Sequence, residues 1–336
     1  MITFSEAIER TRRGDDLSVD QTGYLIDQLL RGQGDPEAVG QLLLAIRDKG
    51  EAVDELVGAA LAMRRHMTPI RHHHRLLLDT CGTGGSGSGT FNISTATAIV
   101  TAACGVPVAK HGNRRATSLS GSADVLAALG VAIESEADQV ARTLDQVGIC
   151  FCFAPKLHPA MRHVVGIRRR LGVPTLFNLL GPLCNPAGAT HQLLGTATRL
   201  TQQKMAAALA QLGTVRSAVV WGDDGQDEVT LGGTTHVIDV ADGRLGEHDW
   251  TAASFRLQPA NVASLKAEDP QRSAAIIREL LDGCPGPCRD TVVAGTAAAL
   301  WLVGKADDLP SAAAMAAAAI DSGQAQQKLR QLVSVA

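Results

Sequence analysis

Neither sign of charge predominates in this sequence of 336 residues, in which 31 lysines and arginines face 34 aspartates and glutamates and give a net charge of −3. A general nucleic-acid binder or a protein of anionic membrane surfaces needs a basic surplus, so the balance argues against both kinds of partner. Any anionic ligand must therefore be held by local features. The apolar fraction of 45% and charged fraction of 19% indicate a soluble globular chain, and its length favours about two domains.

Long apolar runs are missing too. The longest uncharged stretch, residues 80–109, opens with glycines and hydroxyls, and the alanine-rich stretch 291–304 is shorter than the ~20 residues that span a bilayer. Residues 1–16 lack the apolar core of a signal peptide,. The seven cysteines are odd in number and scattered, which favours reduced thiols,. We therefore expect a cytoplasmic protein that binds no membrane.

The first 65 or so residues show the pattern of amphipathic helices. Ser18 and Gln21 have the spacing of a capping box, and the Asp-Pro pair at 35–36 has the form of a helix start,. Gly50 is expected to end that second helix, and residues 53–61 place apolar side chains on one face of another,. The sequence thus begins with a small helical unit joined by short loops.

After residue 70 the pattern changes to alternating strands and helices. An apolar run at 76–78, a glycine-rich loop, a helical stretch to Cys104 and a second apolar run at 106–109 form a β-loop-α-β unit,. Such a unit implies parallel strands with the loop at their carboxyl ends, where α/β proteins bind ligands. Further strands are expected at residues 149–153, 193–197, 217–221 and 236–240, the last followed by a turn at Asp242-Gly243,.

These patterns predict an α/β fold class, with a small all-helical domain and a large α/β domain whose central, mainly parallel sheet is flanked by helices. Residues 159–171 and 175–183 read as helical or irregular and interrupt the α/β pattern. We expect the helical domain to cover residues 1–70, completed by about 159–190. The α/β domain would then comprise residues 71–158 and 191–336.

The strongest motif is the glycine-rich loop. Glycine occupies positions 82, 84, 85, 87 and 89, and hydroxyl and amide side chains follow where the next helix begins. Glycines let the backbone approach a ligand closely and turn its N–H groups inward, which is how loops bind phosphate. The loop is neither a Walker A motif, since no Gly-Lys-Ser/Thr follows, nor a Rossmann fingerprint, since the glycine spacing differs.

Positive charge returns directly after the second strand. Lys110 and Arg114 could meet the anion that the loop binds,. A second hydroxyl-rich turn, residues 117–122, then leads into another helix. Two phosphate-type sites close together suggest a ligand with two phosphate groups.

The chain as a whole resembles the anthranilate phosphoribosyltransferase family. The matching blocks are GTGG and TFNIST within 82–95, KHGNR at 110–114, SGSADVL at 120–126, the stretch 153–162, FNLLGPL at 177–183, Asn185-Pro186, the acidic pair 227–228 and IDSG at 320–323. The family joins a helical and an α/β domain, forms homodimers through its helical domains, and uses phosphoribosyl pyrophosphate (PRPP) with Mg²⁺. The resemblance implies transfer of the phosphoribosyl group to the amine of anthranilate, with release of pyrophosphate, in tryptophan biosynthesis.

The resemblance also implies which residues form each subsite. For PRPP they are Gly82, Thr83, Gly84, Gly85, Ser86, Thr90, Asn92, Ile93, Ser94, Thr95, Lys110, His111, Gly112, Asn113 and Ser122. For anthranilate they are Gly82, Asn113, His158, Arg168, Gly181 and Pro182. For Mg²⁺ they are Ser94, Asp227 and Glu228, and the catalytic residues are Lys110, Asp227 and Glu228. One position departs from the family, whose loop reads GTGGD where this chain has Ser86.

Some of these roles have alternatives. A guanidinium can pair with both oxygens of a carboxylate, which suits Arg168, but most of the charge in 167–170 fits a solvated helix face, so that choice rests on the resemblance. His158 could equally be a structural cap, and His111 could simply shape the turn after its strand.

Two other functions are alternatives. A pyrimidine nucleoside phosphorylase shares the architecture, but its group has a different loop and lacks the NIST and KHGN blocks. A catalytically silent paralogue that binds nucleic acid is opposed by the net charge of −3 and by the presence of Lys110, Arg168, Asp227 and Glu228. A salt-dependent DNA-binding assay separates this last reading from the enzyme.

Overall fold

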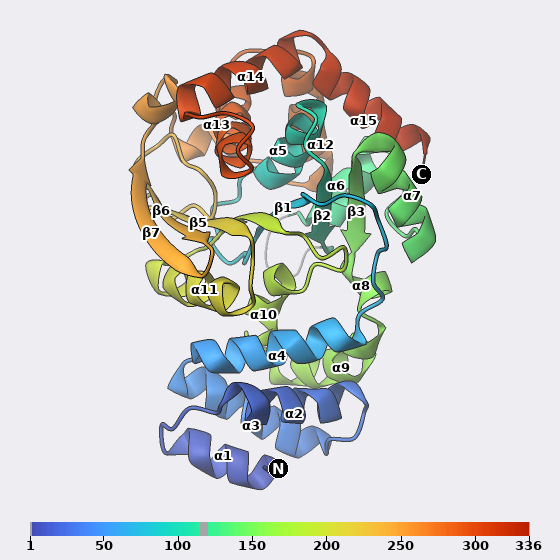
Figure 1. Cartoon of the computed structure of the whole chain (residues 1–336), viewed down its shortest axis with the longest axis vertical. Helices are drawn as coiled ribbons and strands as arrows, with labels where there is room; N and C mark the ends of the chain where they lie inside the picture. The colour runs from blue at the N-terminus through green and yellow to red at the C-terminus, as the bar shows by residue number, and fades with distance from the viewer. Residues whose placement is uncertain (1, 115–119, 336) are drawn as a thin grey trace.

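Four helices open the chain and form a layer of their own at the amino-terminal end of the molecule (Figure 1). The structure is a computed structural model that describes residues 2–114 and 120–335. The four helices are α1 (Phe4–Arg12), α2 (Val19–Leu30), α3 (Pro36–Lys49) and α4 (Val53–His66). Ser18 and Gln21 form the expected capping box of α2, and Asp35 caps α3, which ends at Gly50. The predicted starts of these helices are confirmed.

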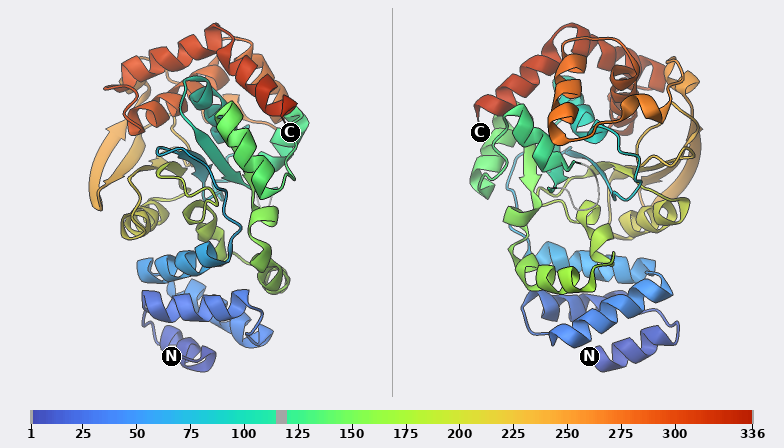
Figure 2. Two further views of the ribbon diagram at one scale, coloured as in Figure 1. Left: turned by 45° about the vertical axis from the view of Figure 1, so that its right-hand side comes forward. Right: turned by 180° about the vertical axis from the view of Figure 1, so that it is seen from behind.

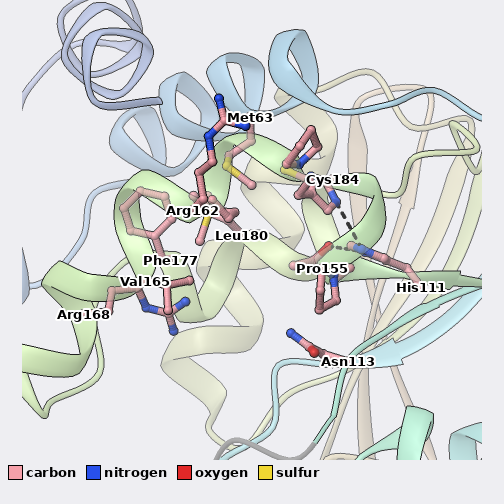
Figure 3. A pocket seen from close by; sticks show the side chains of 15 residues that line it. Met63, His111, Asn113, Pro155, Arg162, Val165, Arg168, Phe177, Leu180 and Cys184 are labelled. Carbon is pink, nitrogen blue, oxygen red and sulfur yellow. Dashed lines mark hydrogen bonds between the residues drawn. The ribbon is translucent and has the colours of Figure 1, made fainter. Parts of the chain in front are cut away.

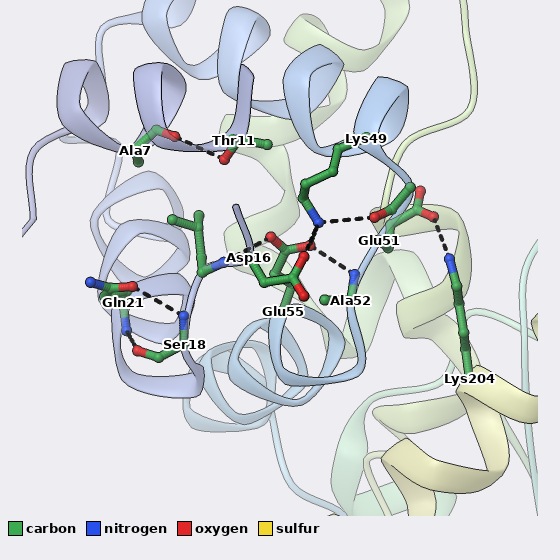
Figure 4. Close-up of polar contacts among 12 residues, drawn as sticks. Ala7, Thr11, Asp16, Ser18, Gln21, Lys49, Glu51, Ala52, Glu55 and Lys204 are labelled. Carbon is green, nitrogen blue, oxygen red and sulfur yellow. Dashed lines mark hydrogen bonds and ion pairs between the residues drawn. The ribbon is translucent and has the colours of Figure 1, made fainter. Parts of the chain in front are cut away.

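A buried carboxylate ties the turns of this layer together (Figure 4). Glu55 is fully buried, and its oxygens accept hydrogen bonds from the backbone N–H groups of Leu17 (3.1 Å) and Ala52 (2.8 Å). Lys49 Nζ lies 3.1 Å from Glu55 and 2.6 Å from Asp16. Because a buried charge needs such partners, this cluster fixes the loop before α2 against the turn before α4.

The chain returns to the helical layer in its middle. The connecting elements are α8 (Ala154–Leu157), η1 (Pro159–Met161), α9 (Arg162–Leu171), α10 (Phe177–Leu180) and η2 (Gly181–Leu183). Helix α9 lies against α2 and α3, and its Val164 and Ile167 belong to the same apolar core as the first helices (Figure 2). The domain limits at residues 70, 159 and 190 stay a prediction.

The described residues form one mixed sheet. Its strands are β1 (Leu78–Gly82), β2 (Val108–Gly112), β3 (Ile149–Phe153), β4 (His191–Gly195), β5 (Arg216–Gly222), β6 (Thr235–Ala241) and β7 (Arg244–Trp250), in the order β3-β2-β1-β4-β5-β6-β7. The first five in this order are parallel, whereas β6 and β7 are antiparallel. Asp242 and Gly243 have φ values of 49° and 73°, as a primed hairpin turn requires.

Several predicted strand limits are wrong by two to four residues. The expected strands at 76–78 and 106–109 lie instead at Leu78–Gly82 and Val108–Gly112, and the one expected at 193–197 begins at His191. The strand at 149–153 is confirmed. The shifts in β1 and β2 have one cause: both strands continue into polar residues such as Asp79 and Lys110, which an apolar pattern does not reveal.

Helices cover both faces of the sheet, as expected for the fold class (Figure 1). One face packs against α5 (Ile93–Ala103), α6 (Ser122–Leu129), α12 (Pro270–Leu281), α13 (Pro287–Leu302), α14 (Leu309–Asp321) and α15 (Gln324–Ser334). The other packs against α7 (Ala137–Val147) and α11 (Arg199–Gln211), and through α11 against α4. The short turns η3 (Ala252–Phe255) and η4 (Val262–Leu265) follow β7. Among the described residues, no helix has the length and apolarity needed to cross a membrane.

Candidate active site

The candidate site lies where β1 and β4 end. The chain leaves β1 for β2 on one side, whereas β4 lies on its other side, so a crevice opens between the two carboxyl ends,. Thr83 N–H donates to Gly195 O at 2.9 Å. A Cβ atom on Gly195 would lie 1.7 Å from the Asp227 carbonyl oxygen, and one on Gly82 3.0 Å from Asp227 Oδ2. Gly195 is therefore required for the backbone of the acidic segment to approach the end of β4, and Gly82 leaves room for the Asp227 carboxylate.

The loop after β1 borders a cavity of about 460 Å³, here called the loop cavity. Gly84, Gly85, Gly87 and Gly89 have φ values of 69°, 89°, 65° and 66°, a left-handed conformation that favours glycine. Ser86 Oγ lies 3.2 Å from Ser88 Oγ, which in turn lies 3.3 Å from the Thr90 hydroxyl. The loop thus alternates left-handed glycines with hydroxyls along one wall.

Most residues expected at the PRPP subsite line this cavity. They are Gly82, Gly84, Gly85, Ser86, Thr90, Asn92, Ile93, Ser94, Lys110, His111, Gly112, Asn113 and Ser122, together with Asp227 and Glu228. Thr83 and Thr95 do not line it, and Thr95 is fully buried with its hydroxyl donating to Asn92 Oδ1. Gly87, Ser88 and Gly89 of the glycine-rich loop and Ser120 and Gly121 of the second hydroxyl-rich turn also line it, as do Cys81 and Phe91, for which the sequence predicted no role. The hydroxyls expected at 117 and 118 lie outside the described residues.

Lys110 is the cation of the loop cavity. Its Nζ donates to Thr80 O at 2.6 Å and to Ser94 Oγ at 3.1 Å, on the α5 side of the sheet. Burial lowers the pKa of Lys110, and the nearby carboxylates of Asp79 and Glu228 oppose that change. Asp79 was not predicted as a site residue, although it directly precedes the loop.

Arg114 does not join Lys110, contrary to expectation. Its guanidinium lies 3.4 Å from Asp124 and 2.9 Å from Glu134, and it is not among the residues that line the loop cavity. Lys110 lies within β2 and Arg114 lies two residues beyond its end, so the sequence alone could not show that the two side chains diverge. The described residues of the cavity wall include no arginine.

The acidic pair faces the start of α5. Glu228 Oε1 accepts a hydrogen bond from Ser94 N–H at 3.1 Å. Burial, with the Asp227 charge adding to it, raises the pKa of Glu228 to about 8. The described residues contain no group of three histidine, cysteine, aspartate or glutamate side chains placed to hold a metal. A cation at this pair would therefore need further oxygens from a ligand.

A second cavity of about 340 Å³, here called the apolar cavity, lies on the opposite face of the sheet end (Figure 3). It is lined by Met63, His111, Asn113, Ala154, Pro155, His158, Pro159, Met161, Arg162, Val165, Arg168, Phe177, Leu180, Gly181 and Cys184. Of the residues expected to bind anthranilate, Asn113, His158, Arg168 and Gly181 line it, Gly82 lines the loop cavity instead, and Pro182 lines neither.

The two cavities meet at His111 and Asn113, which line both. Successive side chains of a strand point to opposite faces. Lys110 therefore contacts Ser94 of α5, while His111 contacts Gly181 on the other side. The end of β2 therefore contributes side chains to both cavities, which differ in polarity. The apolar wall from Met63, Phe177 and Leu180 comes from separate elements, and no local motif predicts its assembly.

Arg168 is the partly buried cation of the apolar cavity. Its Nη2 donates to Asn178 Oδ1 at 3.2 Å, and burial lowers the pKa of its guanidinium. Its neighbours Arg169 and Arg170 are exposed and line neither cavity. The structure thus separates Arg168 from the solvated charge of the same helix.

The two histidines of the apolar cavity are held by one another. His111 Nδ1 lies 3.0 Å from Gly181 O, and the Nε2 atoms of His111 and His158 lie 3.2 Å apart. Because a carbonyl oxygen only accepts, His111 carries its proton on Nδ1 and its Nε2 accepts from His158. Burial lowers the pKa of His111 to about 4 and that of His158 to about 3. Both rings are therefore neutral at pH 7.

This pair predicts a loss of stability in mild acid. A histidine whose pKa is lowered on folding stabilises the fold above the unfolded pKa of ~6.5, and this stabilisation disappears as pH falls toward the folded pKa. We expect the free energy of unfolding to drop by on the order of 2 kcal/mol or more between pH 7.5 and 4.5, measured by urea denaturation. The drop should shrink in His111→Gln, but not in His248→Gln on exposed β7. An equal drop in all three proteins would contradict the assignment.

Comparisons with known proteins agree with this architecture. Residues 5–67 match the glycosyl transferase family helical bundle domain, and residues 74–326 match the a/b domain of the same family. An anthranilate phosphoribosyltransferase from Rhodopirellula baltica is 66% identical over 98% of this chain and 97% of its own.

Solved structures agree as well. The crystal structure of the anthranilate phosphoribosyltransferase from Thermus thermophilus is 40% identical, with a TM-score of 0.92 and 98% of both chains covered. The Saccharomyces cerevisiae enzyme in complex with PRPP and Mg is 27% identical, with a TM-score of 0.88 over 98% of both chains. Identity at this level over the full length places the chain in the anthranilate phosphoribosyltransferase family.

Proposed function

We propose that this protein transfers the phosphoribosyl group of PRPP to the amine of anthranilate and releases pyrophosphate, as a step of tryptophan biosynthesis. The observation that carries the proposal is the junction of two unlike cavities at His111 and Asn113. One is lined by glycines, hydroxyls, a lysine and two carboxylates; the other is apolar and holds a partly buried arginine. A sugar pyrophosphate fits the first, and an aromatic carboxylic acid fits the second.

In this proposal the loop cavity binds PRPP. Gly82, Gly84, Gly85 and the rest of the loop lie close to the pyrophosphate, with Ser86, Thr90, Asn92, Ile93, Ser94 and Ser122 around its oxygens and the ribose phosphate. Thr83 and Thr95 do not line the cavity and would support the residues that do. Lys110 neutralises charge that grows on the leaving pyrophosphate, and its two hydrogen bonds, to Thr80 O and Ser94 Oγ, fix its ammonium group,.

The acidic pair fits Mg²⁺. Ser94, Asp227 and Glu228 offer oxygens only, which a hard cation prefers, and the described residues supply no complete cage. Mg²⁺ usually keeps waters and binds through one or two carboxylates together with substrate phosphates. When bound, it would supply charge neutralisation for the pyrophosphate. Burial and the Asp227 charge raise the pKa of Glu228, and a cation beside the pair would oppose both effects,.

The apolar cavity would bind anthranilate. Arg168 pairs with its carboxylate, Asn113 and Gly181 border the ring near the sugar, and Pro182 supports the turn from behind. An aromatic amine is already unprotonated at neutral pH, so displacement at the anomeric carbon needs positioning rather than a strong base. The imidazoles agree with this, because both nitrogens of His111 are engaged within the protein.

The direct test is incubation with PRPP, Mg²⁺ and anthranilate while the loss of anthranilate fluorescence is followed. We expect turnover that requires all three. Absence of turnover in a folded protein, combined with salt-dependent DNA binding, would support the silent paralogue instead.

The serine at position 86 predicts an altered response to Mg²⁺. Its side chain lines the loop cavity, where the family carries a carboxylate. Wild-type protein should be active, and Ser86→Asp should reach its maximum at a Mg²⁺ concentration lower by roughly threefold or more, with earlier inhibition by excess, since added ligand charge tightens cation binding. Activity is measured across a Mg²⁺ titration, with Ser86→Ala as the control. Superimposable curves for wild-type and Ser86→Asp would remove this position from the metal site.

We further propose a homodimer formed through the helical domain, and a cytoplasmic location. A groove of about 620 Å³ borders α1 and α2, where Ile2 and Tyr24 lie among side chains of both charge signs, and this mixed surface supports the choice. The seven cysteines are free thiols, as a reducing compartment favours,. Light scattering at micromolar concentration tests the dimer, and Tyr24→Arg should shift it toward a monomer.

A further inference from the structure

Asn178, at the start of α10, is held in one orientation beside Arg168. Its Oδ1 accepts from Arg168 Nη2 at 3.2 Å and from Thr175 N–H at 3.0 Å, while its own N–H donates to Thr175 O at 2.8 Å. A backbone N–H can only donate, so the side-chain atom that faces Thr175 must be the oxygen. The same oxygen therefore faces the guanidinium, and the amide is not free to flip.

This contact leaves the charge of Arg168 uncompensated. No carboxylate in the described part of the chain lies within ion-pair distance of it. Arg216 shows the alternative: its partly buried guanidinium makes two contacts with Asp239, at 3.1 and 2.8 Å. A partly buried guanidinium with a neutral partner retains its full attraction for an anion in the cavity.

We propose that Asn178 is a positioning residue for Arg168, whose neutral amide holds the guanidinium in place and keeps it available for the carboxylate of the aromatic acceptor. Asn178 does not line either cavity, so it acts through Arg168. The inference rests on the proposed function for the identity of the acceptor. In this proposal Arg168 selects for anionic aromatic amines, and the neutral side chain at position 178 leaves its charge available.

The test uses Asn178→Asp, which keeps the shape and the oxygen that accepts both hydrogen bonds, and replaces the amide NH2 by a second oxygen that carries negative charge. Binding of anthranilate and of its uncharged amide, 2-aminobenzamide, is measured by calorimetry in the presence of Mg²⁺ and pyrophosphate. Steady-state KM values for anthranilate and PRPP are measured alongside. Asn261→Asp is the matched control, because Asn261 Oδ1 also accepts a backbone N–H, from Ala263 at 2.8 Å, and lines neither cavity.

Wild-type protein should bind anthranilate more tightly than the amide. Asn178→Asp should weaken anthranilate binding and raise its KM by about tenfold or more, with little change for the amide or for PRPP. In an Arg168→Ala background the same substitution should have almost no effect. Asn178→Ala, which releases the guanidinium, should reduce the preference for the carboxylate without inverting it.

Other results would overturn the proposal. Equal weakening of both acceptors, or additive effects with Arg168→Ala, would make Asn178 a purely structural residue. Wild-type protein that binds anthranilate and its amide alike would remove the selection itself. The binding measurements do not depend on turnover, so an inactive protein that still prefers the carboxylate contradicts the proposed reaction while supporting the role of Asn178.

Discussion

Replacing both Asp227 and Glu228 by alanine, or adding excess chelator, is expected to lower turnover by about a hundredfold or more. PRPP carries about four negative charges, and without a cation these would face the two carboxylates directly. The structure supports this expectation. Asp227 lies beside Gly82 and Gly195 at the ends of β1 and β4, and Glu228 accepts a hydrogen bond at the start of α5. Initial rates at saturating PRPP and anthranilate measure the effect.

The matched control removes two carboxylates elsewhere. Glu247→Ala combined with Asp249→Ala alters exposed side chains of β7 that line neither the loop cavity nor the apolar cavity. This variant should retain full turnover. Undiminished activity of the natural protein in excess chelator would contradict the assignment of Mg²⁺ to Asp227 and Glu228.

Arg168→Ala is expected to raise the KM for anthranilate by about 30-fold or more, because a charge-assisted, partly desolvated contact contributes roughly 2 to 4 kcal/mol. The KM for PRPP should change little, since Arg168 lines the apolar cavity and not the loop cavity. Steady-state kinetics with each substrate varied in turn measures both values. Arg169→Ala, on the exposed side of the same helix, is the control. Equal effects of Arg168→Ala on both substrates would assign Arg168 a structural role.

Local signals in the sequence predict the framework of this protein well. The caps at Ser18 and Asp35 and the turn at Asp242-Gly243 depend on a few neighbouring residues, so their chemistry can be read directly. The apolar pattern of the sequence could not predict the ends of β1 and β2, because Asp79 and Lys110 are polar although they pair within the sheet. A strand that carries polar residues at its end therefore lacks, at that end, the apolar pattern by which other strands are predicted.

The residues of the site also differ in how far the sequence alone predicts them. The glycine-rich loop is predicted by its own residues, and Lys110 is predicted as the first positive charge that follows the loop, although it lies inside β2 rather than after it. The role of the acidic pair required the family resemblance, since adjacent carboxylates on a loop are common. Met63 of the apolar wall and the partnership of Asn178 with Arg168 join separate elements, so their recognition required the fold.

The position of β1 inside the sheet, between β2 and β4, has a consequence for how the chain folds during synthesis. Leu78 pairs with Val108 on one side and with His191 on the other, so β1 keeps an open edge until the ribosome has completed β4. Such an edge invites pairing with other chains, and contacts between distant residues form slowly. Asp227, whose carboxylate lies beside Gly82, emerges later still. In the middle of its synthesis the nascent chain therefore exposes an unpaired edge of β1, after the residues of the glycine-rich loop have been made and before those of its acidic partner.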